Sequence, residues 1–475
     1  MSNTIKKSGL ILIGVIAGVM LSLNFSAIAK KENIEAIHPL PIEELRTFAQ
    51  VFGRIKSDYV ESVEDKKLIT EAINGMLVGL DPHSAYLDKD EYKELQIGTQ
   101  GEFGGLGIQV TMEDGVVKVI SPIEDTPAFR AGIQTGDLIV KLDDTVVKGM
   151  TLNDAIKLMR GKPKTSIKIT ILREGESEPL VFNLVRDIIK IQSVKSKMLE
   201  PGYAYIRITQ FQEQTGENLA QAIRTLFGEN KKEMKGLILD LRNDPGGLLN
   251  GAVAVSAAFL PENALVVYTE GRSPDAKMKL HANPEFYLRG PDKDYLRGLP
   301  SEVKTVPMIT LVNGGSASAS EIVAGALQDH KRSVVMGSQT FGKGSVQTIL
   351  PLGNNTAIKL TTARYYTPNG QSIQAQGITP DILDEADNGD DQRLRESDLN
   401  RHLSNGKKTE KKATSETKKT ESKPAGGKKD KKNKDEKDNT PIEFGSEEDQ
   451  LLKQAMNYFK GITLPSPKKN DESES

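Results

Sequence analysis

The chain contains no cysteine among its 475 residues. This absence excludes disulfide bonds, thiolate nucleophiles, cysteine-based zinc sites and iron–sulfur clusters. Histidine is also scarce, and its residues form neither an HExxH motif nor a close pair, so a histidine-ligated metal site would need assembly from distant segments. We therefore expect no metal and no other cofactor, although a Ser/His/Asp triad remains possible in principle. The histidines are His38, His83, His281, His330 and His402.

The chain also lacks an excess of either charge. Lys and Arg number 63, Asp and Glu number 65, and the formal net charge is −2. Proteins that bind nucleic acid usually carry a basic surplus, so we expect no nucleic-acid partner. The length is sufficient for two or three domains of roughly 100–200 residues each.

The clearest targeting signal lies in the first 29 residues. Two lysines precede an apolar run from residue 9 to residue 25, and Ala27-Ile28-Ala29 is typical of a signal-peptidase site. This pattern predicts a signal peptide and a mature chain that begins near Lys30. The run is also just long enough to span a bilayer, so an uncleaved anchor stays open as the alternative. Both interpretations predict an exported, periplasmic protein, associated with the membrane if the segment is not cleaved.

Two kinds of periodicity divide the next part of the chain. Apolar residues recur at helical spacing from Ile42 to about Leu80, which predicts a helical N-terminal segment over residues 30–97. This segment could pack on the core or on a second copy of itself in a homo-oligomer. Residues 98–186 alternate like short strands and contain two short helices, one of which begins at the capping sequence Thr151–Asp154. They predict a compact β-rich module.

Residues 187–384 show strands of the buried type alternating with helices, which predicts an α/β core. The sequence then becomes rich in Lys, Glu, Asp, Ser and Gly, and residues 385–445 contain too few apolar side chains to offset chain entropy, so we expect them to be disordered. Residues 446–460 carry apolar side chains on one helical face, within a C-terminal stretch of residues 446–475. We expect this helix to dock on a sister subunit or on a partner.

A serine-rich segment, Asn313–Glu321, lies where a predicted strand gives way to a helix. Unpaired N–H groups and the positive end of the helix dipole meet there, so an alkoxide or an oxyanion at that point would be stabilised. This makes the serines of the segment candidate nucleophiles. An ordinary helix cap is the competing interpretation.

A lysine in a glycine turn, Lys343, follows between two apolar runs. Loss of solvation there would lower its pKa and let it act as a neutral general base, although an isolated lysine in such a turn is more often an ordinary surface residue. Residues 337–344 also approach the P-loop pattern GxxxxGK[ST] but lack its last residue, which would hold magnesium. Because a strand pattern follows where a P-loop needs a helix, we reject nucleotide binding.

A third motif, Asp240–Gly247, ends a predicted strand in a Pro-Gly-Gly turn. Its glycines would allow a substrate to approach the backbone closely, but the turn could equally be a plain connection. None of the three motifs decides the function by itself.

Together and in this order, the motifs resemble those of the carboxyl-terminal processing (tail-specific) proteases, a family of PDZ-containing Ser/Lys peptidases. Residues 79–86 match the family's element before its PDZ domain. The sequence Gly104-Gly105-Leu106-Gly107-Ile108 resembles the loop of a PDZ fold that receives a peptide carboxylate. Residues 131–133 and 136–139 are similar to the stretch after the first PDZ helix. The resemblance covers about residues 40–385.

The resemblance implies a role for each matching residue. Ser318 is the nucleophile, Lys343 is the general base, and Gln347 orients Lys343. The implied oxyanion donors are the backbone N–H of Ala319 and that of either Gly246 or Gly247, and the choice between the two glycines stays open.

The resemblance also implies an endopeptidase that processes or degrades exported proteins, with a PDZ domain that recognises C-terminal tails and can gate the active site. Protein or peptide substrates with accessible C-termini are the expected partners, together with an adaptor protein. Residues 272–299 and the long charged tail fall outside the motifs, so their role stays open between adaptor binding and oligomerisation. The alternative functions are a catalytically silent PDZ scaffold and an exported binding protein without a peptide groove.

Overall fold

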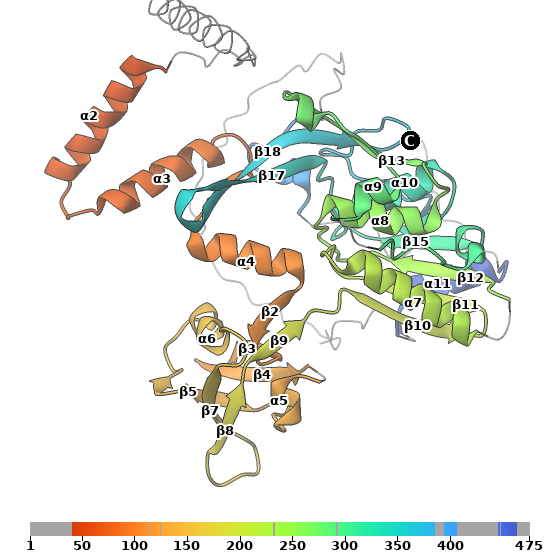
Figure 1. Cartoon of the computed structure of the whole chain (residues 1–475), viewed down its shortest axis with the longest axis horizontal. Coiled ribbons are helices and arrows are strands. Elements are labelled where there is room, and N and C mark those ends of the chain that lie inside the picture. The colour runs from red at the N-terminus through yellow and green to blue at the C-terminus, as the bar shows by residue number, and fades with distance from the viewer. Residues whose placement is uncertain are drawn as a thin grey trace, which may run out of the picture. The chain divides into compact units, whose positions relative to one another are not determined.

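The computed structural model describes most of the chain from residue 40 to residue 462, and element labels follow Figure 1. The predicted signal peptide lies outside the described residues. The described residues form two compact units, which divide between residues 72 and 73. No helix in the described ranges is long and apolar enough to cross a membrane. These ranges are 40–113, 115–123, 125–230, 233–290, 293–384, 394–405, 445–446 and 448–462.

The first unit contains the predicted N-terminal helices. Helix α2 spans Ile42–Asp58, and α3 spans Asp65–Val78, which continues past the unit boundary. The two helices are joined by a 2.6 Å ion pair between Lys56 and Asp65. The apolar spacing seen in the sequence therefore does produce helices here.

The second unit begins with β1 (Ala85–Leu87) and α4 (Lys89–Gln100). Helix α4 starts at a capping box in which Asp88 accepts hydrogen bonds from the N–H groups of Asp90 and Glu91. It ends at Gly101, whose φ of 75° lies in the left-handed region that glycine tolerates. Both ends of α4 are thus determined by local sequence.

A β-rich module follows α4. Its main sheet has the order β3-β4-β5-β7-β8, with β6 beside β5, while β2 pairs with β9 where the chain enters and leaves the module. The core contains Val119, Ile139, Ile169 and Ile171, all fully buried. The predicted strands and two helices are confirmed. Their bounds are β2 Glu102–Gly105, β3 Ile108–Glu113, β4 Val116–Pro122, α5 Pro127–Arg130, β5 Leu138–Leu142, β6 Thr145–Val146, α6 Leu152–Met159, β7 Ser166–Leu172, β8 Leu180–Val185 and β9 Asp187–Lys190.

The α/β core is built on a second sheet with the order β10-β11-β12-β15-β16-β19. Within this sheet β11, β12, β15, β16 and β19 are parallel, and β10 is antiparallel to β11. Helices α7, α8 and α10 cover one face of this sheet, and α11 covers the other. The bounds are β10 Val194–Glu200, β11 Tyr203–Ile208, α7 Thr215–Glu229, β12 Gly236–Asp240, α8 Leu249–Phe259, β15 Met308–Val312, α10 Ala319–Asp329, β16 Val334–Gly337, β19 Ile382–Leu383 and α11 Gln450–Phe459.

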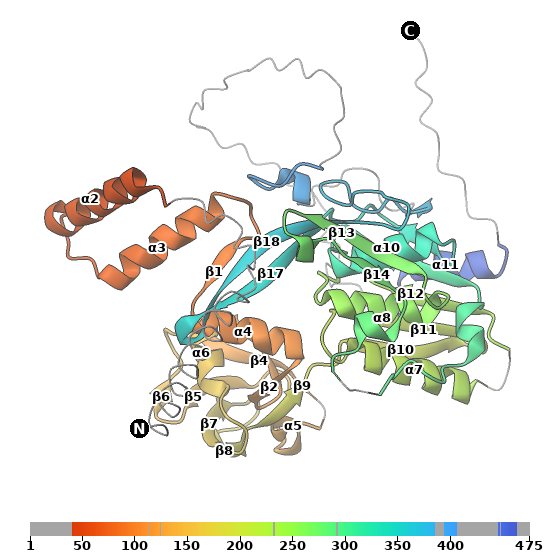
Figure 2. The ribbon, with the colours of Figure 1, turned by 45° about the horizontal axis from the view of Figure 1, so that its top comes forward.

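A further sheet packs against α8 and α10 and has the order β1-β18-β13-β14, with β17 also paired to β18 (Figure 2). Strand β1 thereby ties the segment before the β-rich module to the α/β core. The remaining bounds are β13 Leu265–Gly271, η1 Pro274–Ala276, β14 Lys279–His281, α9 Pro284–Tyr287, η2 Ser301–Lys304, β17 Ser345–Leu352, η3 Gly353–Asn355, β18 Thr356–Tyr366 and η4 Glu396–Asp398.

Two expectations for the C-terminal part need correction. Residues 394–405 lie within the stretch predicted to be disordered, yet they contain η4 and a fully buried Glu396. Helix α11 packs on its own chain, where Leu451, Leu452 and Ala455 contact the sheet. The composition could not reveal either feature, because both depend on partners far away in the sequence.

The docking of α11 can be tested by truncating one of its core-facing side chains. Leu452 is 5% exposed, whereas Tyr458 on the same helix is 41% exposed. We expect Leu452→Ala to lower the free energy of unfolding by about 2–5 kcal/mol and Tyr458→Ala to lower it much less, measured by urea denaturation. Equal losses for the two variants would contradict this packing, and a loss that depends on protein concentration would indicate docking on another subunit.

Candidate active site

Three sequence motifs meet at one edge of the parallel sheet. Strand β12 runs into the Asp244–Gly247 turn, β15 runs into the serine-rich segment, and β16 runs into the Lys343 loop. Because these strands are parallel and adjacent, their carboxyl ends lie together, which is where open α/β sheets bind ligands. Segments separated by about a hundred residues in the sequence are therefore neighbours.

Ser318 lies at the N-terminus of α10 with φ 56° and ψ −113°. A positive φ is strained for a residue with a side chain, and such strain persists only where the surroundings enforce it. Asp244 enforces it from the adjacent turn, because its carbonyl oxygen accepts hydrogen bonds from the Ala317 N–H at 3.0 Å and the Ser320 hydroxyl at 2.9 Å. The Ser318 side chain is half-buried and lines a cavity of about 750 Å³.

The fully buried carboxylate of Glu321 joins the serine turn to the lysine loop. It accepts hydrogen bonds from the Ser318 N–H at 2.8 Å, the Gly342 N–H at 2.7 Å and the Lys343 N–H at 3.0 Å. The Thr340 hydroxyl adds a fourth bond at 2.6 Å. Burial raises the pKa of Glu321 to about 7, although these hydrogen bonds act against the rise. Glu321 was not predicted as a site residue, and its only signal in the sequence was the capping position three residues after Ser318.

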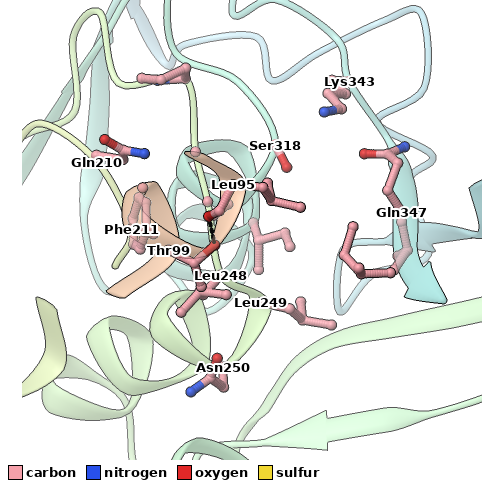
Figure 3. A pocket seen from close by; sticks show the side chains of 18 of the residues that line it. Leu95, Thr99, Gln210, Phe211, Leu248, Leu249, Asn250, Ser318, Lys343 and Gln347 are labelled. Atoms are coloured by element: carbon pink, nitrogen blue, oxygen red, sulfur yellow. Dashed lines mark hydrogen bonds between the residues drawn. The ribbon is translucent and has the colours of Figure 1, made fainter. Parts of the chain in front are cut away.

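Lys343 lines the same cavity as Ser318, and its side chain is half-buried. Burial, followed by the nearby charge of Lys359, lowers the pKa of Lys343. The carboxylates of Glu396, Glu321 and Asp81 oppose this change less strongly. No hydrogen bond joins Lys343 to Ser318 within the described ranges, although Figure 3 shows both side chains facing the cavity.

Gln347 lies on β17, and its amide also faces the cavity (Figure 3). The amide nitrogen donates hydrogen bonds to the Ser345 hydroxyl at 3.0 Å and the Thr361 hydroxyl at 3.3 Å. No hydrogen bond from Gln347 to Lys343 is found in the part of the chain that the structure describes. Orientation of the lysine by Gln347 therefore stays a prediction.

The Pro-Gly-Gly turn lies directly against Ser318. A Cβ atom at Gly246, whose φ is 94°, would come within 2.7 Å of the Ser318 Cβ. The Gly246 N–H donates to the Asp244 carboxylate at 2.8 Å, and the Gly246 carbonyl accepts from the Phe211 N–H at 2.9 Å. The N–H groups of Gly247 and Ala319 donate no hydrogen bond among the described residues. Two backbone donors beside Ser318 are thus available to a ligand.

The cavity wall contains residues from several segments. Leu95 and Thr99 come from α4, and Phe211, Leu248 and Leu249 add apolar surface around Ser318 (Figure 3). Arg289 and Lys359 bring positive charge to the lining, and neither was predicted as a site residue from the sequence. Arg289 belongs to residues 272–299, whose role was left open, so part of that stretch borders the cavity.

The predicted carboxylate loop of the β-rich module, Gly104–Ile108, does not line this cavity. Gly107 has φ 76°, and a Cβ atom there would come within 2.2 Å of Thr126, so the loop needs glycine at this position. In the described structure, the N–H groups of Leu106 and Gly107 donate no hydrogen bond. The described residues also contain no group of His, Asp or Glu side chains arranged to hold a metal ion.

Models of three protein families match the chain. Peptidase family S41 matches residues 202–383, the PDZ domain matches residues 104–184, and the N-terminal domain of the activating protease CtpB matches residues 18–91. The S41 and PDZ matches fall on the α/β core and on the β-rich module respectively. The architecture predicted from the sequence, with a PDZ domain in front of a peptidase core, is thereby confirmed.

Two sequence relatives support the same assignment. A carboxy-terminal-processing protease from Bartonella bacilliformis is 46% identical over 402 residues, which cover 83% of this chain and 88% of that protein. The carboxy-terminal processing protease CtpA from Bacillus subtilis is 36% identical over 334 residues, which cover 70% of this chain and 67% of that protein. Among solved structures, a photosystem II D1 C-terminal processing protease shares 30% identity with a TM-score of 0.40, covering 71% of this chain and 86% of that one.

The chain belongs to peptidase family S41 and is a serine peptidase of the carboxy-terminal processing type. The alternative of a catalytically silent scaffold is therefore not supported. The predicted family is confirmed.

Asp244 provides a test of the turn beside Ser318. Its side chain is fully buried, one carboxylate oxygen has no hydrogen-bond partner, and burial raises the pKa to about 7. The folded state then holds a proton that the unfolded chain releases near its ordinary pKa of 3.8, so the stability that this carboxyl contributes is lost as the pH rises from about 3.8 through about 7 and changes no further above that.

We expect Asp244→Asn, which stays neutral at every pH and keeps an acceptor for the Gly246 N–H, to gain stability relative to the wild type between pH 5 and pH 8. Urea denaturation at both pH values measures the difference. The exposed Glu229→Gln serves as a control that should track the wild type. A stability difference that does not change with pH would contradict the assignment of a neutral Asp244.

Proposed function

We propose that this chain cleaves exported proteins near their C-termini with Ser318 as nucleophile and Lys343 as general base. The proposal is carried by one observation: a strained serine and a lysine with a lowered pKa face one cavity, while Glu321 binds the backbones of both. A neutral amine can accept a proton at a pH where an ordinary lysine cannot.

The reaction then runs in two halves. Neutral Lys343 takes the hydroxyl proton as the Ser318 oxygen attacks the scissile carbonyl carbon, and the resulting ammonium protonates the departing amine. In the second half, Lys343 takes a proton from water, the water oxygen attacks the acyl-enzyme ester, and Ser318 regains its proton. Proton transfer requires the two side chains to come within hydrogen-bond reach, and catalytic bonds of this kind often tighten only once substrate is bound.

We assign the oxyanion donors to Ala319 and Gly247 rather than to Gly246. Gly246 already donates its N–H to Asp244. The carbonyl of Gly246 points to Phe211, and in a trans peptide the following N–H points the opposite way, so the Gly247 N–H is directed away from Phe211. Ala319 is the first residue of α10, where N–H groups lack helical partners. Two such donors stabilise the charge that develops on the carbonyl oxygen.

Recognition of substrate tails is assigned to the PDZ domain. Strand β3 is at the edge of its sheet, so an extended peptide can add to it through backbone hydrogen bonds. The N–H groups of Leu106 and Gly107, at the start of that edge, are available to the terminal carboxylate of the peptide. An unfolded protein tail can meet both requirements.

We also propose that the chain is exported to the periplasm and assembles as a homo-oligomer. Export is supported by the charged, apolar and Ala-x-Ala pattern of residues 1–29. Assembly through residues 40–80 is supported by the apolar stripe of α2, which contains Leu45, Phe48 and Val51. An adaptor protein remains part of this proposal as a carrier of substrates.

Cleavage by single-site variants tests the catalytic pair. With residues 30–475 and an unstructured protein that has an apolar C-terminus, Ser318→Ala and Lys343→Ala should each lower the rate by at least about a thousandfold. Wild type and Glu229→Gln should cut alike, as followed by mass spectrometry of the products. Comparable cutting by wild type and Ser318→Ala would place the active site elsewhere and overturn the proposal.

Lys359 provides a separate test of the base. Its positive charge lowers the pKa of Lys343, so its removal should raise that pKa. Because only neutral Lys343 accepts the proton, Lys359→Met should move the acid limb of the kcat/KM profile to higher pH. Lys331→Met, at an exposed lysine outside the cavity lining, is the control. An acid limb that stays in place in Lys359→Met would contradict the role of Lys343.

A further inference from the structure

A short segment beyond the matched peptidase region folds back onto the Lys343 loop. We call residues 394–405 the strap; the S41 match ends at residue 383. Within the strap, Glu396 is the buried residue of η4, and its side chain is fully excluded from solvent. A buried carboxylate is retained in a fold only where partners compensate for its lost solvation, so its partners indicate what the strap does.

Glu396 holds the residue that precedes Lys343 by two positions. The backbone N–H of Glu396 donates to the Phe341 carbonyl oxygen at 3.1 Å. The neighbouring Arg395 reinforces this contact, because its guanidinium donates to the Gln339 side chain at 3.1 Å and to the Gln376 carbonyl at 3.1 Å. The strap therefore forms hydrogen bonds with the loop on the N-terminal side of Lys343.

Gln374 connects the strap to the backbone on the other side of Lys343. Its amide nitrogen donates to Glu396 at 2.9 Å and to the Leu403 carbonyl at 3.1 Å, both in the strap. Its amide oxygen accepts the Gly344 N–H at 3.0 Å. Since an amide group has a fixed donor end and a fixed acceptor end, Glu396 determines which end of Gln374 faces Gly344.

A third partner comes from the element that precedes the PDZ domain. The His83 ring nitrogen Nε2 lies 2.8 Å from the Glu396 carboxylate. The adjacent Asp81 accepts hydrogen bonds from the N–H groups of His83 and Ser84 and from the Thr361 hydroxyl on β18. Glu396 thus lies where three segments meet: residues 79–86, the Lys343 loop, and the Gln374 segment.

We propose that Glu396 is a positioning residue of this peptidase, which holds the Phe341–Gly344 loop from both sides so that the Lys343 amine faces Ser318, and which supplies negative charge beside that amine. The proposal rests on the proposed function of Lys343. It extends the catalytic unit to a segment outside the matched peptidase region.

A purely structural role and a positioning role predict different results. The Glu396 charge raises the pKa of Lys343, so a neutral side chain of the same size should lower that pKa further and leave the fold in place. Loss of the whole side chain removes the anchor of Gln374 and should misplace the amine, which costs catalytic rate rather than substrate affinity. The charged or titratable groups that surround the pair of Glu396 and Lys343 are His83, Asp81, Glu321, Lys359, Tyr365 and Arg395, and none of them is substituted in these variants.

The experiment compares Glu396→Gln and Glu396→Ala in residues 30–475, with kcat and KM measured from pH 5.5 to pH 9.5 and melting temperatures recorded in parallel. Glu302→Gln and Glu302→Ala are matched controls, because Glu302 is an exposed glutamate that also lies in a 3-10 helix. We expect the acid limb of Glu396→Gln to move to lower pH. We expect Glu396→Ala to lose about tenfold or more in kcat, with little change in KM.

The inference is overturned if the acid limb of Glu396→Gln coincides with that of the wild type, or if Glu396→Ala loses rate only in proportion to its unfolded fraction. Glu396→Gln keeps the inference testable if Glu396→Ala fails to fold. Ser318→Ala distinguishes failure of the proposed function from failure of the inference about Glu396. Cleavage by Ser318→Ala would contradict the proposed function itself. An inactive Ser318→Ala together with fully active Glu396 variants would contradict only the inference about the strap.

Discussion

The buried carboxylate of Glu321 is the interaction on which the rest of the site depends. It binds the backbone at Ser318 on one side and the backbone at Gly342 and Lys343 on the other. If Glu321 lost these donors, its buried carboxylate would have no hydrogen bonds to offset the cost of desolvation. The hydrogen bonds to Glu321 therefore hold the serine turn and the lysine loop together. The two chemical groups come from different strands, and Glu321 fixes the distance between their backbones.

The parallel sheet makes this arrangement possible. Its strands deliver the Asp244 turn, the serine-rich segment and the lysine loop to one edge, and each of these connections has a glycine or a strained residue where backbone comes close to backbone. Asp244 organises the first two connections through its carbonyl oxygen and its carboxylate. The strap organises the third from outside. Hydrogen bonds therefore fix the backbone of all three connections around the cavity. A fixed backbone suits a reaction in which backbone N–H groups must point at one oxygen atom.

The sequence was most informative where chemistry depends on local pattern. The serine-rich segment, Lys343 and the Pro-Gly-Gly turn could be located because glycine turns and strand-to-helix junctions leave a local signature, whereas Ser318 was chosen within its segment by the family resemblance. The strand alternation of residues 98–186 predicted the β-rich module. The choice between Gly246 and Gly247 as the oxyanion donor could not be made from the sequence, because it depends on which of the two N–H groups already donates a hydrogen bond to Asp244. That is a property of the folded turn.

The strap and the position of helix α11 depend on partners distant along the chain. Glu396 looked like part of a charged linker, and only its contacts with His83 and Gln374 reveal that it is buried. Helix α11 was expected to dock on a sister subunit or a partner, but it packs on the sheet of its own chain, on the face opposite α7, α8 and α10. Asp449, which caps this helix, forms an ion pair with Arg242 there. Composition indicates how much apolar surface a segment can bury by itself. It gives no information on the contacts that distant segments provide once the chain has folded.

The central claim is that Ser318 is the nucleophile and that Lys343 activates it. Labelling of residues 30–475 with a fluorophosphonate, followed by mass mapping of the modified peptide, addresses this claim without the need for a known substrate. The account predicts modification of Ser318 in the wild type and much slower modification in Lys343→Ala. Labelling of a different serine, or labelling of Ser318 at the same rate with and without Lys343, would contradict it.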